Sequence, residues 1–312
     1  MYKILVTGAN GLLGQKLTAY LATEKEIQVV ATSRGCSRFE LPDNVEYIPI
    51  DITQCNQMMT TLNQVKPDII IHTAATTNVD YCEQHQDECW ETNVQGVAHI
   101  VQGAKHCKSF LIHISTDFVF DGEETPLPED ANLNPVNFYG QSKVQAERLI
   151  QQSDIRYAIL RTAVVYGVAS NLSRTNFVLW VKDCLESKKK IQVVDDQYRT
   201  PTLADDLAMA CYLVSLHRAQ GIFHISGSEV LTPYQMALIV AKVFGLDEKL
   251  IERSDSSNFN QVAKRPMKTG LSIDKAWKEF AFMPCSFYEG VMLIEQQMTQ
   301  SPIDEQHIMR IN

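Results

Sequence analysis

A glycine-rich turn near the N-terminus constrains the fold more than any other feature of the sequence. An apolar run over residues 4–6 is followed by Gly8, Gly11 and Gly14, and residues 12–21 have the pattern of an amphipathic helix. Gly8 permits a tight turn, Gly11 lets the backbone approach a pyrophosphate, and Gly14 lets helix and strand pack closely. A pyrophosphate would bind free N–H groups at the helix start, where the helix dipole favours an anion. The stretch therefore predicts nucleotide binding, with a purely structural turn as the alternative.

Strand and helix patterns alternate through the first two thirds of the chain. Strands are expected at residues 4–6, 27–32, 45–50, 68–72, 110–114 and 156–160, and helices at 12–21, 53–65, 83–107 and 138–152. This alternation predicts an α/β fold, a Rossmann-type doubly wound parallel sheet with helices on both faces. Ligands of such sheets bind at the carboxyl ends of the strands.

The pattern loosens after Gly167. Helices are expected at residues 177–187, 203–217 and 232–245, the last with Thr232 as N-cap, Pro233 in the first turn and Gly245 at its end. Short strands are expected at 191–194 and 222–225. We expect residues 1–166 to form a dinucleotide-binding domain and residues 167–312 a smaller C-terminal substrate lobe, with the chain able to cross back between them. Residues 301–312 are expected to form a poorly ordered tail.

Composition narrows the classes of partner and the compartment. The 312 residues carry a net charge of −9, which argues against a general nucleic-acid or anionic-membrane surface. No apolar run approaches the ~20 residues that span a bilayer, and no secretory signal is visible. The eight cysteines form no Cys-x-x-Cys pair and are expected to be reduced thiols of a cytoplasmic protein. Cys82, His85 and Cys89 lie close in sequence, but no second cluster completes a tetrahedral site, so we expect no metal.

The end of the second predicted strand bears on the choice of cofactor. Folds that prefer NAD usually place a carboxylate there, whereas this chain has Ser33 and Arg34, which can bind a 2′-phosphate. We therefore predict NADP(H), with NAD(H) as the alternative and with Arg38 as a further cation for the same pocket. Asp51 follows the third strand, where its carboxylate could accept a hydrogen bond from the adenine amino group. Further candidates for cofactor contacts are Ile52, Ala74, Ala75 and Thr76.

The run Tyr139-Gly140-Gln141-Ser142-Lys143 is the strongest chemical signal. Residues i and i+4 share one face of a helix, so Tyr139 and Lys143 would point to the same side. A neighbouring ammonium lowers the pKa of a tyrosine, and the pair could then donate a proton to a carbonyl as a hydride arrives. Ser115 and Thr116, at the end of the fifth strand, supply hydroxyls that could hold the same carbonyl oxygen. A solvated helix face is the alternative.

These motifs resemble those of the extended short-chain dehydrogenases/reductases. The resemblance rests on the run from Thr7 to Gly14 (Thr-Gly-Ala-Asn-Gly-Leu-Leu-Gly), on Asn93, and on the Ser-Thr and Tyr-x-x-x-Lys motifs. The run from Ile114 to Gly122 (Ile-Ser-Thr-Asp-Phe-Val-Phe-Asp-Gly) is similar to the active-site stretch of dTDP-4-dehydrorhamnose reductases. So are Asp196-Gln197, Thr200-Pro201-Thr202 and Arg265-Pro266.

The resemblance implies an NADPH-dependent reductase of a 4-keto nucleotide sugar. Its catalytic residues would be Thr116, Tyr139 and Lys143, with Tyr139 as the acid and Lys143 also holding the nicotinamide ribose. Cofactor contacts would come from Gly8, Asn10, Gly11, Leu12, Gly14, Asn93, Tyr139 and Thr162. The nucleotide sugar would face Asp117, Phe118, Asn176 and Arg265. Many members of the family are dimers, which implies a homodimer, and the apolar residues between 286 and 298 could serve as its interface.

Three departures from the family pattern affect the predicted substrate. Phe118 stands where the family typically has tyrosine, and Val164 stands where it usually has tryptophan, so an aromatic wall for the sugar is missing. Ala146 replaces a common glycine. Two alternatives follow: a non-catalytic NADP-binding regulatory subunit, like the β subunit of methionine adenosyltransferase, or an epimerase or dehydratase of nucleotide sugars.

Overall fold

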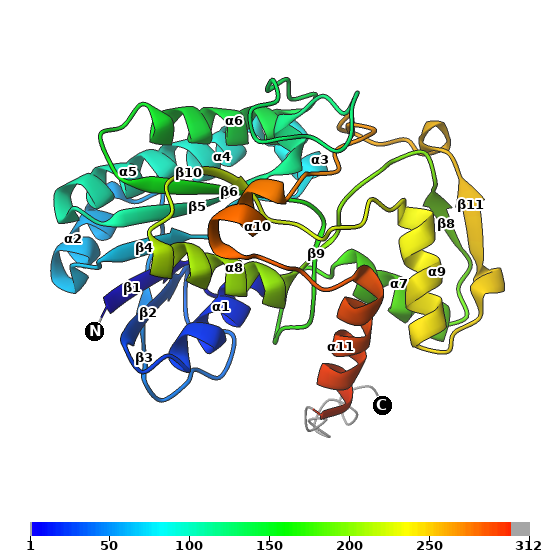
Figure 1. The fold of residues 1–312 in the computed structure, drawn as a ribbon, viewed down its shortest axis with the longest axis horizontal. Coiled ribbons are helices and arrows are strands. Elements are labelled where there is room, and N and C mark those ends of the chain that lie inside the picture. The colour runs from blue at the N-terminus through cyan, green and yellow to red at the C-terminus, as the bar shows by residue number, and fades with distance from the viewer. Residues whose placement is uncertain (1, 301–312) are drawn as a thin grey trace.

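A seven-stranded parallel sheet forms the centre of the protein in a computed structural model that describes residues 2–300 (Figure 1). The structure therefore confirms the predicted α/β, doubly wound fold. All neighbouring strands pair in parallel. Their order across the sheet is β10 (Gly221–His224), β6 (Tyr157–Thr162), β5 (Phe110–Thr116), β4 (Ile69–His72), β1 (Tyr2–Thr7), β2 (Ile27–Ser33) and β3 (Val45–Pro49).

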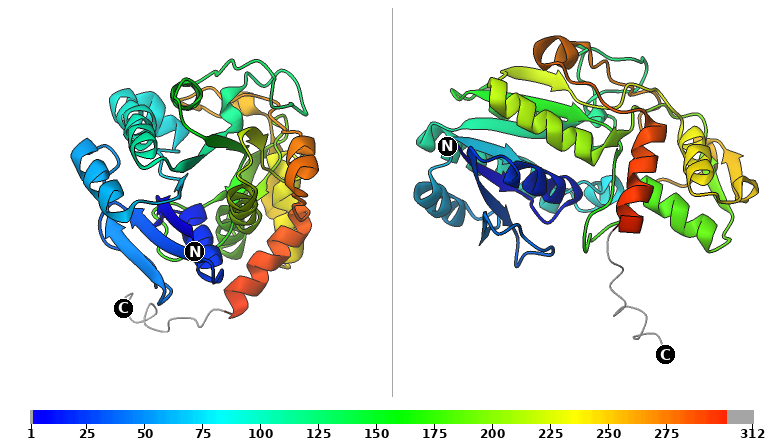
Figure 2. Two further views of the ribbon diagram at one scale, coloured as in Figure 1. Left: turned by 60° about the vertical axis from the view of Figure 1, so that its left-hand side comes forward. Right: turned by 60° about the horizontal axis from the view of Figure 1, so that its bottom comes forward.

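Helices cover both faces of this sheet (Figure 2). On one face lie α1 (Leu12–Ala22), α8 (Ala204–His217) and α10 (Asp274–Phe280), and on the other α2 (Cys55–Val65), α5 (Gly96–Cys107) and α6 (Phe138–Gln151). Side chains alternate between the two cores, because successive residues of a strand point to opposite faces. In β1, Ile4 and Val6 pack with α1, whereas Leu5 packs with α2.

The single helix expected over residues 83–107 is wrong. The segment contains α3 (Val79–Gln84), α4 (Gln86–Trp90), a π-helical turn η1 (Glu91–Gln95) and α5. His85 interrupts it, with φ −127° and ψ 63°. The apolar spacing concealed this break. Cys82 and Cys89 are separated by seven residues, which is about two turns of a continuous helix, and both are buried in one cluster although the helix is interrupted between them.

A smaller part of the molecule lies beyond the carboxyl ends of the sheet (Figure 1). Its helices α7 (Phe177–Glu186), α9 (Pro233–Val243) and α11 (Phe287–Gln300) share one apolar core with the parallel strands β8 (Ile191–Val194) and β11 (Ile251–Ser254). The predicted start of α9 is confirmed, because Thr232 and Gln235 form a capping box and Pro233 occupies the first turn. Gly245 follows that helix with φ +63°, as its predicted role as the stop requires.

The chain crosses between the two parts more than once. β7 (Val165–Tyr166) and β9 (Thr202–Leu203) form a short parallel pair, and then α8, β10 and α10 return to the large sheet. Short helical turns complete the described elements: η2 (Asp117–Val119), η3 (Glu248–Leu250) and η4 (Ser256–Asn258). The division at residues 166 and 167 stays a prediction. No helix in the described part of the chain is long and apolar enough to cross a membrane, and the predicted tail at residues 301–312 lies outside the described residues.

Candidate active site

The glycine turn brings the start of α1 against the ends of β1 and β4. Gly8 adopts φ +72°, and a Cβ at this position would lie 2.7 Å from the backbone nitrogen of Ala74. A Cβ on Gly14 would lie 2.2 Å from the carbonyl oxygen of Gly8, so no larger residue fits between helix and turn. Gly11 is the N-cap of α1 and supplies no side-chain cap. The turn therefore combines close backbone packing with a helix N-terminus that no side chain covers, as dinucleotide binding requires.

A cavity of about 240 Å³ lies between the glycine turn and the ends of β2, β3 and β4. Arg34 and Arg38 are both exposed at its rim, and the carboxylate of Asp51 accepts hydrogen bonds from the backbone nitrogen and hydroxyl of Thr53. The structure thus brings together ten of the predicted cofactor residues: Gly8, Asn10, Gly11, Ser33, Arg34, Asp51, Ile52, Ala74, Ala75 and Thr76.

A second cavity, of about 650 Å³, continues from the first toward the smaller part. The two cavities share Asn10, Gly11 and Ala75 in their walls. The predicted catalytic and substrate residues meet in the second cavity, together with two further cofactor residues, Leu12 and Thr162: they are Thr116, Asp117, Phe118, Tyr139, Lys143, Asn176 and Arg265.

Tyr139 and Lys143 reach this cavity from the first turns of α6. Asn137 caps the helix by accepting a hydrogen bond from the backbone nitrogen of Gly140. Gly140 permits a close approach of the helix to β5 and its following turn, since a Cβ there would lie 2.2 Å from the carbonyl oxygen of Phe118. Both side chains are buried, as on a helix face that packs against a sheet.

The predicted lowering of the Tyr139 pKa is wrong. Burial raises the pKa of Tyr139, and only a hydrogen bond with Thr116 acts in the opposite direction. The contacts of Lys143 are with other groups: its Nζ lies 2.7 Å from the carbonyl oxygen of Ile114 and 3.1 Å from Nε2 of His113. Burial lowers the pKa of Lys143 to about 8.

Thr116 and Ser115, neighbours at the end of β5, point in different directions. Ser115 also lines the cavity, but its hydroxyl donates its proton to Glu147 at 2.5 Å and is engaged there. The Thr116 hydroxyl lines the cavity, donates to Asp117 at 3.1 Å and accepts from the backbone nitrogen of Phe118. Of the two hydroxyls that the sequence offered, Thr116 is therefore the one placed for chemistry.

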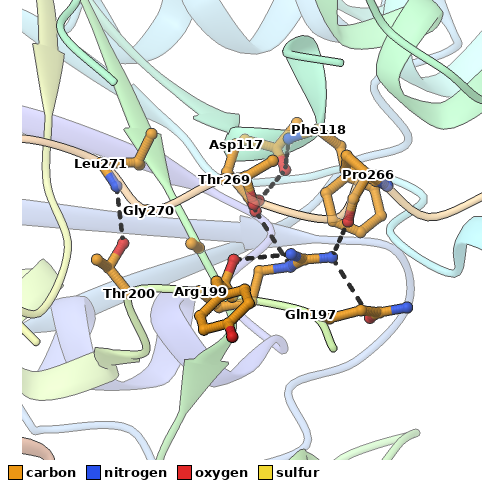
Figure 3. A network of polar contacts seen from close by, with 12 residues as sticks. Asp117, Phe118, Gln197, Arg199, Thr200, Pro266, Thr269, Gly270 and Leu271 are labelled. Carbon is orange, nitrogen blue, oxygen red and sulfur yellow. Dashed lines mark hydrogen bonds and ion pairs between the residues drawn. The ribbon is translucent and has the colours of Figure 1, made fainter. Parts of the chain in front are cut away.

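Asp117 belongs to a buried polar network that joins the two parts of the molecule (Figure 3). Its carboxylate lies 3.8 Å from Nε of Arg199 and accepts a hydrogen bond from Thr269. Arg199 also donates to the carbonyl oxygens of Pro266 and Met267, and its guanidinium lies over the Phe118 ring. Burial raises the pKa of Asp117 and the positive charge of Arg199 opposes that shift. Asp117 lines the second cavity and accepts hydrogen bonds from Thr116 and Thr269, and its role in substrate contact stays a prediction.

Three further predicted residues have protein partners in the structure. Asn93 lines neither cavity: it is buried, bonds to the backbone of Thr76 and donates to the Ser142 hydroxyl, so its expected contact with the cofactor is replaced by support of the Thr76 loop. Asn176 caps α7 and donates to the carbonyl oxygen of Gly167. The Arg265 guanidinium makes two bonds of 2.8 Å to Asp80.

Sequence reasoning missed several residues of the site. Arg199 lines the second cavity and lies between the Asp196-Gln197 and Thr200-Pro201-Thr202 motifs, which were the available signal for it. Gln197 was identified as part of a motif but not as a site residue, and it lines the same cavity. Arg174 lines it from a polar loop that carried no motif. Within residues 2–300 no group of three or more His, Cys, Asp or Glu side chains could hold a metal.

Comparison with known proteins agrees with this geometry. The family described as "RmlD substrate binding domain" matches residues 2–300. The chain is 28% identical to a dTDP-4-dehydrorhamnose reductase of Aggregatibacter actinomycetemcomitans, over 93% of this chain and 97% of that protein. It is 31% identical to the methionine adenosyltransferase 2 subunit beta of Xenopus tropicalis, over 90% and 91% of the two chains.

A solved structure extends the match to three dimensions. The dTDP-4-dehydrorhamnose reductase of Bacillus anthracis, crystallised in complex with NADP, is 25% identical and aligns with a TM-score of 0.82 over 95% of this chain and 99% of that one. The glycine turn, the cavities beside it and the match over nearly the whole length lead to one conclusion: this chain belongs to the RmlD substrate-binding domain family.

Proposed function

We propose that the protein is an NADPH-dependent reductase of a 4-keto nucleotide sugar, of the dTDP-4-dehydrorhamnose reductase type. The observation that carries this proposal is the convergence of Thr116, Tyr139 and Lys143 in one cavity that also contains Leu12 of the glycine turn. A reductase needs a proton donor beside the cofactor pocket, and the end of a parallel sheet is where both can meet.

The residues of the first cavity fit a dinucleotide. The uncapped start of α1 would hold the pyrophosphate, and Lys143 would hold the nicotinamide ribose. Ser33, Arg34 and Arg38 favour the 2′-phosphate of NADP(H), and NAD(H) is the alternative cofactor. The relative from Bacillus anthracis, whose structure contains NADP, supports the same choice. When bound, the nicotinamide would supply a hydride.

The chain's own groups would supply the proton and the orientation. Burial raises the pKa of Tyr139, so the phenol stays protonated at neutral pH and can donate to a carbonyl oxygen. Thr116 lies beside it and would orient the same oxygen. Near neutral pH, Lys143 is still mostly charged, because its pKa is about 8, so its ammonium could donate to the nicotinamide ribose.

The sugar end of the cavity differs from that of typical reductases of this type. Phe118 lacks the hydroxyl of a tyrosine, and Val164 leaves space where a tryptophan would form a wall. Arg174 lines the same cavity, and no ion pair holds it within residues 2–300, so it is available for a diphosphate. We therefore expect the sugar ring to bind here with more water around it.

A regulatory NADP-binding subunit is the second candidate. The similarity to the β subunit of methionine adenosyltransferase, at 31% identity over 90% of the chain, favours it. An epimerase or dehydratase is less well supported, since an elimination needs a free acid beside Thr116, and the Asp117 carboxylate is bonded to Thr269 and Arg199.

The first experiment follows NADPH oxidation with dTDP-4-dehydro-6-deoxy-L-mannose. We expect turnover by the wild-type protein and a loss of about 10²- to 10⁴-fold in kcat/KM for Tyr139→Phe, with NADPH still bound by the variant. If NADPH binds and no keto sugar is reduced, the reductase proposal is wrong. Co-elution with a catalytic subunit of methionine adenosyltransferase would then support the regulatory role.

We also propose a cytoplasmic protein that forms homodimers and binds neither nucleic acid nor membranes. All eight cysteines are free thiols, which supports a reducing compartment. The apolar face of α11 packs against α9 within the chain through Phe287, Val291 and Ile294, so a dimer would use the outer side of that helix, where Tyr288 and Met292 are exposed. Light scattering of the purified protein tests the dimer.

A further inference from the structure

A buried histidine lies against the lysine of the proposed catalytic trio. His113 is on β5, on the face that packs against α6, and only 1% of its surface is exposed. Its Nε2 lies 3.1 Å from Nζ of Lys143, and Nζ also donates to the carbonyl oxygen of Ile114 at 2.7 Å. The glycine turn and the Tyr-x-x-x-Lys run gave no indication of this contact, because 30 residues separate the two side chains.

The contact fixes the direction of the ammonium group. A lysine ammonium carries three N–H donors. One points to Ile114 and a second to His113, so the third is left for the cavity that Lys143 lines. Without the imidazole, the ammonium would be held at a single point and could rotate about its last bond.

A charged Lys143 that donates to Nε2 requires a neutral His113 with its proton on Nδ1. Burial and the neighbouring Lys143 charge hold the pKa of His113 well below its usual range, so the ring is neutral. Its Nδ1 has no hydrogen-bond partner in the described part of the chain. The ring stacks on His72 at 5.3 Å, and His72 is itself held at Nδ1 by the Thr7 hydroxyl.

The other titratable groups around Lys143 leave this arrangement in place. Glu147, one turn further along α6, favours the ammonium but is itself paired with Arg161. The Cys89 thiol faces Lys143 from α4, and Tyr139 lies one turn earlier on the same helix. Of the titratable groups around Lys143 in the described residues, His113 is the one whose hydrogen-bond acceptor contacts Nζ, at 3.1 Å.

We propose that His113 is a positioning residue: its neutral imidazole accepts a hydrogen bond from Lys143 and, with the Ile114 carbonyl, directs the remaining N–H of the ammonium into the cavity. The structural part of this proposal is independent of the reaction. The catalytic consequence rests on the proposed reductase function.

The first test uses the protein without cofactor or substrate. Nitrogen-15 NMR of histidine-labelled protein reports which ring nitrogen carries the proton, and His113→Gln assigns the resonances. We expect an unprotonated Nε2 on His113 that shifts in Lys143→Met, while exposed His106 is unaffected. A protonated Nε2, or one that Lys143→Met leaves unchanged, overturns the proposal.

The second test compares His113→Leu with His113→Gln in the reductase assay. Leucine removes the acceptor, so the ammonium is less stabilised, and the alkaline limb of the kcat/KM profile should move down by about one pH unit. The side-chain carbonyl that His113→Gln introduces can replace Nε2 as acceptor and should keep the limb near its wild-type position. Equal shifts in both variants, with both folded by circular dichroism, contradict the positioning role. Absence of wild-type turnover would refute the reductase function, while the NMR test still decides the contact.

Discussion

Individual side chains in the site owe their chemistry to burial as much as to their neighbours. Tyr139 and Lys143 share a helix face, as the i, i+4 spacing predicts, yet the expected lowering of the tyrosine pKa does not occur. Local spacing determines which way two side chains point. It does not reveal that β5 offers Lys143 a carbonyl and an imidazole, which contact its ammonium in the structure.

The choice of NADP(H) depends on single cations at the end of β2. We expect Arg34→Ala to weaken NADPH binding by about tenfold, because an exposed arginine loses one charge-assisted bond to the 2′-phosphate. The affinity for NADH, which lacks this phosphate, should change by less than about twofold. The dissociation constant for NADH divided by that for NADPH should therefore fall. Fluorescence titration with both cofactors measures the ratio.

A matched variant controls for the loss of one positive charge. Arg148 is exposed on α6 and lines neither cavity, so Arg148→Ala should leave both affinities unchanged. If Arg34→Ala weakens NADPH and NADH equally, Arg34 is a solvated loop cation and not a selector of the phosphate.

At the scale of elements, the sequence predicts best those strands and helices whose patterns are local. The six strands expected before residue 167 are all present in the sheet. The position of β10 beside β6 was not predictable, because it depends on pairing between His224 and Arg161, which are 63 residues apart. The same limit applies to the ion pair of Asp80 and Arg265, 185 residues apart.

A buried ion pair links α6 to the sheet. Arg161 on β6 makes two bonds to Glu147, at 3.0 and 2.8 Å, and both side chains are almost completely buried. Glu147→Gln leaves the guanidinium without a charge partner, so the free energy of unfolding should fall by about 3–5 kcal/mol. Urea denaturation followed by circular dichroism measures this loss.

Two comparisons separate the buried charge from a general effect of mutation. In Glu147→Leu/Arg161→Met an apolar pair replaces both charges, and much of the lost stability should return. Lys190 and Glu252 form an exposed pair, so Lys190→Ala should have little effect. A Glu147→Gln variant as stable as wild type would show that the guanidinium finds enough other acceptors, such as the Glu129 carbonyl oxygen.

At the scale of the whole molecule, a row of buried polar side chains crosses four adjacent strands of the central sheet. On the face of the sheet that packs against α6, buried His72, His113, Arg161 and His224 lie on the four adjacent strands β4, β5, β6 and β10. Burial lowers the pKa of all three histidines, to about 3 for His72 and His224. The sheet that carries the site therefore holds three imidazoles that stay neutral in the folded state.

These histidines make stability depend on pH with a definite sign. Between pH 6.5 and about 3 the unfolded chain binds protons on histidine that the folded protein excludes, so stability is lost as the pH falls through this range. Each histidine contributes up to about 1.4 kcal/mol per pH unit. Asp117 and Asp206, whose pKa values are raised by burial, act in the opposite direction above pH 3.8, so the net slope is smaller than that of the histidines alone.

A comparison of variants isolates one histidine from this net slope. His224→Gln keeps a polar side chain beside the Leu127 carbonyl but removes one titrating group, so its free energy of unfolding should fall about 1 kcal/mol less per pH unit between pH 6.5 and 5 than that of wild type. His106 is exposed, and His106→Gln should keep the full wild-type slope. Urea denaturation at several pH values gives the slopes. Because only a group with different pKa values in the folded and unfolded chains can change the slope, parallel curves for wild type and His224→Gln would mean that His224 titrates alike in both states.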